Sequence, residues 1–252
     1  MNFQKILTCL LLCYFISGCS VQNKKSSTAQ ENQKTSNHEV KVNDTNKHLI
    51  PDESEVTVAQ KHRLTDFSHI DDTTFVNLKE LSNDFIYDMK YATTSNFLKK
   101  AVYDCDACYL RLKAAKALIR ANEKFIKKGY RIVLFDCYRP LSVQKKMWEI
   151  VPNPTYVANP QKGSIHNRGA AVDIGLESLN GNRVDMGTEF DFFGIEASHH
   201  YENLPEEIIN NRKLLKKVMI QSDFRIFDSE WWHYNLKAAQ KFPVSDFNWN
   251  CD

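Results

Sequence analysis

The sequence predicts one α+β domain in which a central, mostly antiparallel sheet is flanked by helices. From about residue 85 to residue 236, the hydrophobic periodicity switches repeatedly between the spacing of strands and the spacing of helices. These elements do not follow the regular strand–helix–strand alternation that builds a parallel sheet. The part of the chain with this mixed pattern, about residues 73–252, also has the right size for one sizeable hydrophobic core. We therefore expect a single compact domain over residues 73–252.

The first half of this domain contains two predicted strands around a helix. Residues 85–91 alternate like a strand, with an apolar or aromatic side chain at every second position. Residues 110–128 repeat apolar positions at helical spacing, and Gly129 is suited to end that helix. Residues 130–135 are rich in β-branched and aromatic side chains and predict the next strand.

The second half contains two predicted helices and a closing pair of strands. A helix begins at Pro140 and runs to Trp148. Residues 205–221 predict a longer helix, because proline and two glutamates open it and lysines follow, as the helix dipole favours. Residues 224–227 and 231–236 are the closing strands.

The first 18 residues are typical of a secretory signal. Lys5 supplies the positive charge, and the apolar run of residues 6–16 is too short to span a bilayer. The run ends in Ile-Ser-Gly-Cys at residues 16–19, which resembles a bacterial lipobox. We therefore expect residues 1–18 to be removed and Cys19 to be lipidated. The alternative is an ordinary secretory signal that leaves Cys19 in the tail.

Residues 19–72 are expected to form a lipid-anchored, disordered tether. From Ser20 to about Gln60 the chain has no Phe, Trp, Tyr or Gly, so it cannot bury enough apolar surface to offset the entropy of ordering. Several acyl chains on Cys19 would give stable anchoring. Ser20 resembles the sorting pattern of the outer membrane. We expect the protein in the cell envelope, anchored at the outer membrane and facing the periplasm.

Charge and cysteine content narrow the function classes. The formal net charge is +2, and no basic block stands out, so nucleic-acid binding has no support. Outside the cytoplasm, the remaining cysteines Cys105, Cys108, Cys137 and Cys251 suggest disulfides, with three connectivities that the sequence leaves open. The spacing of Cys105 and Cys108 also occurs in metal and redox sites, but no second such pair supports those functions.

Two distant motifs indicate a metallohydrolase. His166 and Asp173 lie seven residues apart, and Glu230 and His233 lie three apart some sixty residues later. Two imidazoles and one carboxylate hold zinc and leave a fourth position open for water, and a spare glutamate can act as base. Gly169 can turn the chain so that His166 approaches Asp173 from a loop. We expect one Zn²⁺ per chain, bound on the sheet.

The residues around these motifs resemble a known family. Ser-x-His-x-x-Gly-x-Ala-x-Asp at 164–173, followed by Glu-x-x-His at 230–233, is similar to the zinc-binding signature of the D-alanyl-D-alanine metallopeptidases. Residues 87–97, Asp-Cys-Tyr-Arg-Pro at 136–140 and the softer match at 186–191 narrow the resemblance to the VanX-like D-alanyl-D-alanine dipeptidases. The resemblance covers about residues 80–240.

The resemblance implies catalytic roles at the matching positions. His166, Asp173 and His233 would be the zinc ligands, and Glu230 the general base that takes a proton from the attacking water. Arg139 would steady the tetrahedral intermediate. These roles imply hydrolysis of D-Ala-D-Ala to two D-alanines.

The resemblance also implies substrate contacts. Ser164 would touch the substrate, and Asp191 would face its ammonium group. Asp136, three residues before Arg139, resembles a positioning carboxylate and is grouped with the substrate-binding residues. Cys137 departs from the family pattern, where a small apolar residue is usual. If it is bridged, the bridge would pin the loop that aims Arg139.

Two other functions remain open from the sequence. The same metal core could serve a zinc D,D-carboxypeptidase or endopeptidase that acts on peptidoglycan stem peptides. The segment 87–97 and Asp191 favour the free dipeptide, because a longer peptide has no ammonium at that place. A non-catalytic cell-wall-binding module is disfavoured, because ligands, base and arginine are all present.

Overall fold

The computed structural model describes residue 67 and residues 69–251. The expected signal sequence, the lipidation site Cys19 and all but the end of the expected tether lie outside the described residues. Among the residues that are described, no helix is long and apolar enough to cross a membrane.

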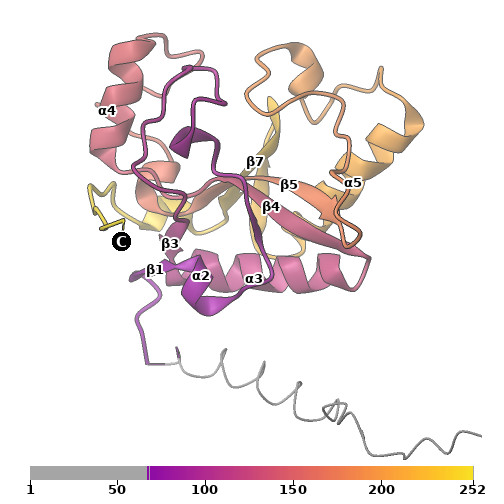
Figure 1. The fold of residues 1–252 in the computed structure, drawn as a ribbon, viewed down its shortest axis with the longest axis horizontal. Coiled ribbons are helices and arrows are strands. Elements are labelled where there is room, and N and C mark those ends of the chain that lie inside the picture. The colour runs from indigo at the N-terminus through magenta and orange to yellow at the C-terminus, as the bar shows by residue number, and fades with distance from the viewer. Residues whose placement is uncertain (1–66, 68, 252) are drawn as a thin grey trace, which may run out of the picture. The chain divides into compact units, whose positions relative to one another are not determined.

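A five-stranded mixed sheet forms the centre of the fold (Figure 1), with the strand order β2-β4-β5-β7-β6. The strands are β2 (Ile86–Tyr87), β4 (Tyr130–Asp136), β5 (Ala171–Ser178), β7 (Glu230–Leu236) and β6 (Phe224–Phe227). Only β2 and β4 pair in parallel, and the other neighbours are antiparallel. The structure therefore confirms the α+β class and the mostly antiparallel sheet.

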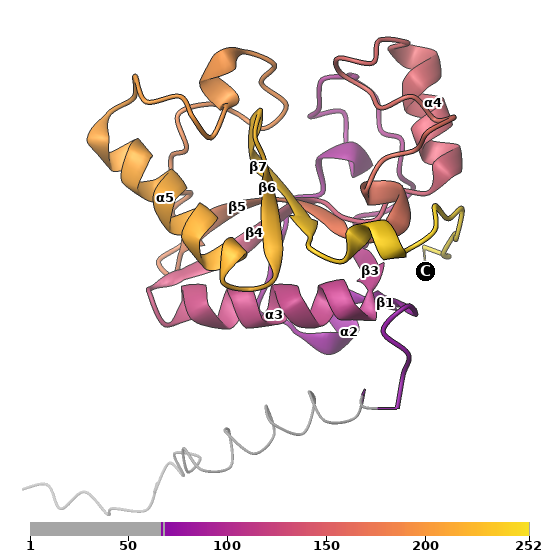
Figure 2. The same ribbon diagram turned by 180° about the vertical axis from the view of Figure 1, so that it is seen from behind.

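Three longer helices flank the sheet, close to where the periodicity predicts them. They are α3 (Leu112–Ile126), α4 (Leu141–Ile150) and α5 (Glu206–Ile220). The α3 helix runs along one face of the sheet, whereas α4 and the loop between β5 and α5 rise on the opposite side (Figures 1 and 2). Four of the nine buried residues of α3 are alanines, which lets the helix lie close to β4.

Short elements at the start of the domain were not predicted. Strands β1 (Phe75–Asn77) and β3 (Tyr109–Arg111) pair as a separate two-stranded sheet, with the short helix α2 (Leu78–Leu81) after β1. Further along the domain, the chain also forms short 3₁₀ turns, which were not predicted either. They are η1 (Lys90–Ala92), η2 (His166–Arg168), η3 (Ile195–Ala197) and η4 (Ala239–Lys241).

The strand predicted over residues 85–91 is largely wrong. Only Ile86 and Tyr87 pair with β4, and the chain then leaves the sheet in η1. The carbonyl of Tyr91 accepts the backbone N–H groups of Val102 and Tyr103, so a loop rather than a sheet partner satisfies this backbone. As a result, Tyr91 is buried beside the site described below.

Candidate active site

Register across the sheet brings together side chains from three strands. Asp173 on β5 pairs with His233 on β7, and Asp136 at the end of β4 pairs with Asp173. Residues directly opposite each other project from the same face of a sheet. The three side chains therefore lie in a row across the centre of the sheet, on one face.

A 3₁₀ turn adds His166 to this row. Gly169 ends η2 with a φ of 70°, in the left-handed region that favours glycine. A Cβ atom at this position would collide with the ring of Phe75, so a larger residue would force that ring to shift. The turn brings His166 from outside the sheet to the side of Asp173.

Three potential ligand atoms converge at this point. His166 Nε2 lies 3.1 Å from His233 Nδ1, and Asp173 Oδ1 lies 2.9 Å from His233 Nδ1 and 3.4 Å from His166 Nε2. Separations of about 3.3 Å are expected between atoms that share one ion in tetrahedral coordination at 2.0–2.1 Å. The three residues could therefore hold one metal ion.

Hydrogen bonds turn both imidazoles toward that point. His166 Nδ1 lies 2.7 Å from the Cys137 carbonyl oxygen, which can only accept. His233 Nε2 lies 3.0 Å from Asn235 Oδ1. Each imidazole donates its proton to these oxygens, so His166 Nε2 and His233 Nδ1 carry lone pairs. Such partners fix the tautomer and orientation of metal-ligating histidines.

The charges around the three atoms also suit a cation. Burial alone would raise the pKa of Asp173, but the neighbouring His166 and His233 outweigh it and hold that pKa well below its usual range. Asp173 is therefore ionised. Burial alone would lower the pKa of His233, but Asp173 and Glu230 outweigh it and raise that pKa. Surroundings that favour a proton on His233 would also favour a metal ion there.

Glu230 lies beside this cluster because β7 is irregular. Phe227 pairs with Glu230, yet the preceding Ile226 pairs with Tyr234, so β7 carries extra residues at this point. This bulge puts Glu230 and His233 on the same side, with Glu230 Oε2 3.9 Å from His233 Nδ1. Burial raises the pKa of Glu230, although His233 opposes the rise. A carboxylate with a raised pKa suits a general base.

Arg139 reaches the site from the segment between β4 and α4. Its Nη2 donates to Asp136 Oδ2 at 2.5 Å, and its Nη1 donates to Gln144 Oε1 at 3.0 Å. Its Nε is buried without a hydrogen-bond partner among the described residues. Two of the five N–H groups of the guanidinium therefore hold it in place.

Asp136 lies behind Arg139 and is fully buried. Its Oδ1 also accepts from the Tyr103 hydroxyl at 2.7 Å and from the Cys137 backbone N–H at 2.9 Å. It does not line the cavity described next. This placement favours a positioning role for Asp136 over direct contact with a substrate.

A cavity of about 300 Å³ joins the candidate residues. It is lined by His166, Asp173, His233, Glu230, Arg139, Ser164 and Asp191. Its volume lies at the small end of the range of about 300–1,000 Å³ that is usual for ligand sites. All the catalytic, metal-binding and substrate-binding residues suggested by the sequence except Asp136 therefore meet in one space. Their individual roles stay predictions.

Asp191 approaches the cavity from the loop between β5 and α5. Its carboxylate accepts the Tyr91 hydroxyl at 3.0 and 3.1 Å and forms no ion pair with another described residue. Burial raises the pKa of Asp191 well above its usual value, and the negative charge of Asp173 adds to the rise. A half-buried carboxylate without a cation is a suitable partner for a ligand's ammonium group.

Sequence reasoning missed two residues of the site. Tyr91 was assigned to a strand, although its hydroxyl orients Asp191. Asn235 was not considered, although it orients His233. The sequence did point to Asn235, because it follows His233 by two residues and residues two apart on a strand share a face.

Two disulfides join Cys105 to Cys251 and Cys108 to Cys137, which settles the open connectivity. The second lies directly behind the site, because Cys137 carries the carbonyl that accepts His166 Nδ1–H. Cys137 also precedes Arg139 by two residues in the sequence. The Cys108–Cys137 disulfide thus fixes the backbone from which both His166 and Arg139 are oriented.

Removing this disulfide should weaken both stability and metal binding. The double variant Cys108→Ala/Cys137→Ala is expected to lose about 2–5 kcal/mol of unfolding free energy, as measured by urea denaturation. It should also bind a divalent metal more weakly in competition with a chromophoric chelator. The matched control is Cys105→Ala/Cys251→Ala, which should lower stability but leave metal affinity unchanged. Equal metal affinity in both double variants would contradict this role.

Comparisons with known proteins agree with the geometry. A family model described as Peptidase_M15, D-ala-D-ala dipeptidase, matches residues 71–250. The D-alanyl-D-alanine dipeptidase of Escherichia coli (strain K12) is 33% identical over 181 residues, which cover 72% of this chain and 94% of that protein. The D-alanyl-D-alanine dipeptidase of Enterococcus faecium is 33% identical over 196 residues, which cover 69% of this chain and 96% of that protein.

The match to solved structures is weaker. A vancomycin-resistance D,D-pentapeptidase, VanY, aligns with a TM-score of 0.36 and 16% identity, over 54% of this chain and 79% of that chain. The family assignment rests instead on the family model, which spans nearly the whole described domain, and on the two relatives. By these matches, the chain belongs to the Peptidase_M15 family of D-ala-D-ala dipeptidases.

Proposed function

We propose that this protein is a zinc-dependent dipeptidase that hydrolyses D-Ala-D-Ala to two D-alanines. The observation that carries the proposal is the convergence of His166 Nε2, His233 Nδ1 and Asp173 Oδ1, with Glu230 beside them in one small cavity. The names of the relatives support D-Ala-D-Ala as the substrate.

Zinc fits this donor set better than other common divalent ions. Two imidazole nitrogens and one carboxylate oxygen are typical of catalytic zinc, whereas calcium and magnesium prefer oxygen ligands alone. The three protein ligands would leave one position open. When bound there, zinc would supply Lewis-acid activation of water and of the scissile carbonyl.

The chain's own residues would handle the proton and the developing charge. Glu230 would take a proton from the attacking water and pass it to the nitrogen of the leaving D-alanine. Arg139 lines the cavity and would stabilise the negative charge that develops on the carbonyl oxygen. Asp136 would keep the guanidinium in place.

The ends of the cavity favour a free dipeptide over a longer peptide. Asp191 would pair with the substrate ammonium, and Ser164 would contact the substrate at another point of the cavity. Aromatic rings from two loops also line the cavity: the Phe193 ring centroid lies 4.5 Å from that of Tyr156. Phe97, from a third loop, packs against Phe193 at a centroid distance of 5.0 Å. A stem peptide would have no ammonium for Asp191 and would have to pass these rings.

A chromatographic assay of purified protein tests the proposal. D-Ala-D-Ala, L-Ala-L-Ala and a stem pentapeptide are offered separately, with zinc present and after chelation. We expect D-alanine release from D-Ala-D-Ala alone, and only with zinc. Cleavage of the pentapeptide without cleavage of the dipeptide would instead support the D,D-carboxypeptidase or endopeptidase function. Binding of wall peptides without any cleavage would support a non-catalytic module.

We also propose that Cys19 anchors the protein in the cell envelope, with residues 19–72 as tether and residues 73–252 as the catalytic domain. The support is the lipobox-like sequence before Cys19 and the polar composition after it. Cys19→Ser is expected to move the protein from the membrane fraction to the soluble fraction of lysed cells. Unchanged fractionation of this variant would contradict lipidation at Cys19.

A further inference from the structure

The loop that carries Asp191 is fastened at both ends by one side chain. Arg212, on α5, donates from Nε to the Met186 carbonyl oxygen at 2.7 Å. Its Nη1 donates to the carbonyl oxygens of Glu196 and Ser198 at 2.8 and 3.1 Å. These acceptors lie at the two ends of residues 186–198, here called the Asp191 loop. One guanidinium therefore closes the loop at its base.

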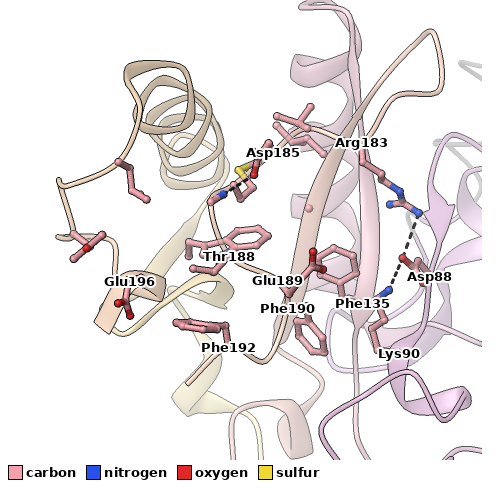
Figure 3. Close-up of a pocket in the computed structure, with 18 of the residues that line it drawn as sticks. Asp88, Lys90, Phe135, Arg183, Asp185, Thr188, Glu189, Phe190, Phe192 and Glu196 are labelled. Atoms are coloured by element: carbon pink, nitrogen blue, oxygen red, sulfur yellow. Dashed lines mark hydrogen bonds and ion pairs between the residues drawn. The ribbon is translucent and has the colours of Figure 1, made fainter. Parts of the chain in front are cut away.

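The middle of the Asp191 loop is supported from below only in part. Trp231 Nε1 donates to Thr188 Oγ1 at 2.8 Å, and the ring centroid of Phe190 lies 5.2 Å from that of Phe135. A groove of about 770 Å³ lies between this loop and the sheet, lined on the sheet side by residues that include Phe135 and Leu176. Figure 3 shows Thr188 and Phe192 of the loop around this groove, across from Lys90. Because a groove takes the place of solid packing beside these contacts, the bonds at the two ends of the loop contribute to its position.

The conformation of Asp191 itself needs such support. Its φ is 60°, in the left-handed region that non-glycine residues seldom occupy. Such conformations persist where the surrounding structure imposes them. The contacts near Asp191 include the Tyr91 hydroxyl bonds and the packing of the neighbouring rings, with the Phe190 centroid 5.6 Å from that of Trp232 and the Phe193 centroid 5.0 Å from that of Phe97.

Burying the charged side chain of Arg212 is energetically unfavourable. It is 6% exposed, and it forms no ion pair with any described carboxylate. Its Nη2 is buried without a hydrogen-bond partner among the described residues. Burial lowers the pKa of Arg212, as expected for a charge removed from water. An apolar side chain would fill this space at less cost, so the three hydrogen bonds are the contribution that only arginine makes.

We propose that Arg212 is a positioning residue that holds Asp191 where it meets the substrate ammonium, and so sets the preference for a free dipeptide. The proposal rests on the proposed dipeptidase function. Arg212 does not line the cavity, and all three of its hydrogen-bond acceptors belong to the Asp191 loop.

Steady-state kinetics of Arg212→Lys and Arg212→Met, in the zinc-loaded full chain, test this role. The lysine variant keeps the charge but lacks the planar fork that reaches both loop ends. We expect KM for D-Ala-D-Ala to rise about tenfold or more, as for the loss of one hydrogen bond to a charged group, with kcat and zinc content nearly unchanged. The matched control Lys213→Met removes an exposed charge from the same helix and should behave as wild type.

A double-variant cycle with Asp191→Asn then separates positioning from general stability. If Arg212 acts through Asp191, adding Arg212→Lys to Asp191→Asn should raise KM little further. Hydrogen exchange should be faster in residues 187–195 of Arg212→Lys and unchanged in β5. Unchanged KM, a loss confined to kcat, or effects that add fully would overturn the proposal. Wild-type protein that fails to cleave D-Ala-D-Ala would instead overturn the dipeptidase function.

Discussion

Glu230→Gln is expected to lower kcat for D-Ala-D-Ala by about 10²–10⁴-fold while the variant keeps its zinc. Glutamine has nearly the same shape, but its amide cannot accept a proton from water. The three converging ligand atoms belong to other residues, so the ion should stay bound. Initial rates of D-alanine release, together with zinc content by atomic absorption, measure both effects on the same sample. Glu230→Ala should show the same separation of metal binding from turnover.

The control for this experiment is Glu207→Gln, which neutralises an exposed glutamate in the first turn of α5. It should keep wild-type kcat, KM and zinc content. Full activity in Glu230→Gln would refute the assignment of Glu230 as base. Loss of zinc together with activity would show that Glu230 holds the metal, and the ligand set would have to be redrawn.

The sequence predicted the longer elements because their periodicity is sustained. The helices α3 and α5 each repeat apolar positions over several turns, and β4 is a run of β-branched and aromatic residues. The pairing of β1 with β3 could not be predicted, because each strand has three residues and the pairing joins distant segments. Residues 85–91 alternate like a strand, but only Ile86 and Tyr87 pair with β4. The backbone partners of Tyr91 lie in a following loop, and the alternation of side chains carries no information about that change.

The site was predicted as a set of residues but not as an arrangement. Motif spacing singled out His166, Asp173 and His233, and their convergence depends on register and bulges that the spacing does not encode. The separation of Glu230 from His233 would place them on opposite faces of a regular strand, and only the bulge in β7 puts them together. Contacts that orient the site, such as Tyr91 with Asp191, join residues about a hundred positions apart and follow from the fold alone.

His233→Ala should abolish both zinc binding and turnover, unlike Glu230→Gln. Removing His233 Nδ1 leaves one imidazole and one carboxylate, too few donors to hold zinc firmly. Asn235→Ala should have a milder effect, weakening zinc affinity about 10–100-fold, because it removes only the acceptor that orients the imidazole. Thermal unfolding with and without chelator provides a second measurement, since an ion bound only by the folded state raises Tm. The chelator should lower the Tm of the wild-type protein by removing its zinc. The Tm of His233→Ala should respond neither to zinc nor to the chelator. A His233→Ala protein that still binds one zinc per chain and cleaves D-Ala-D-Ala would show that the convergence of the three side chains on the sheet is not the metal site.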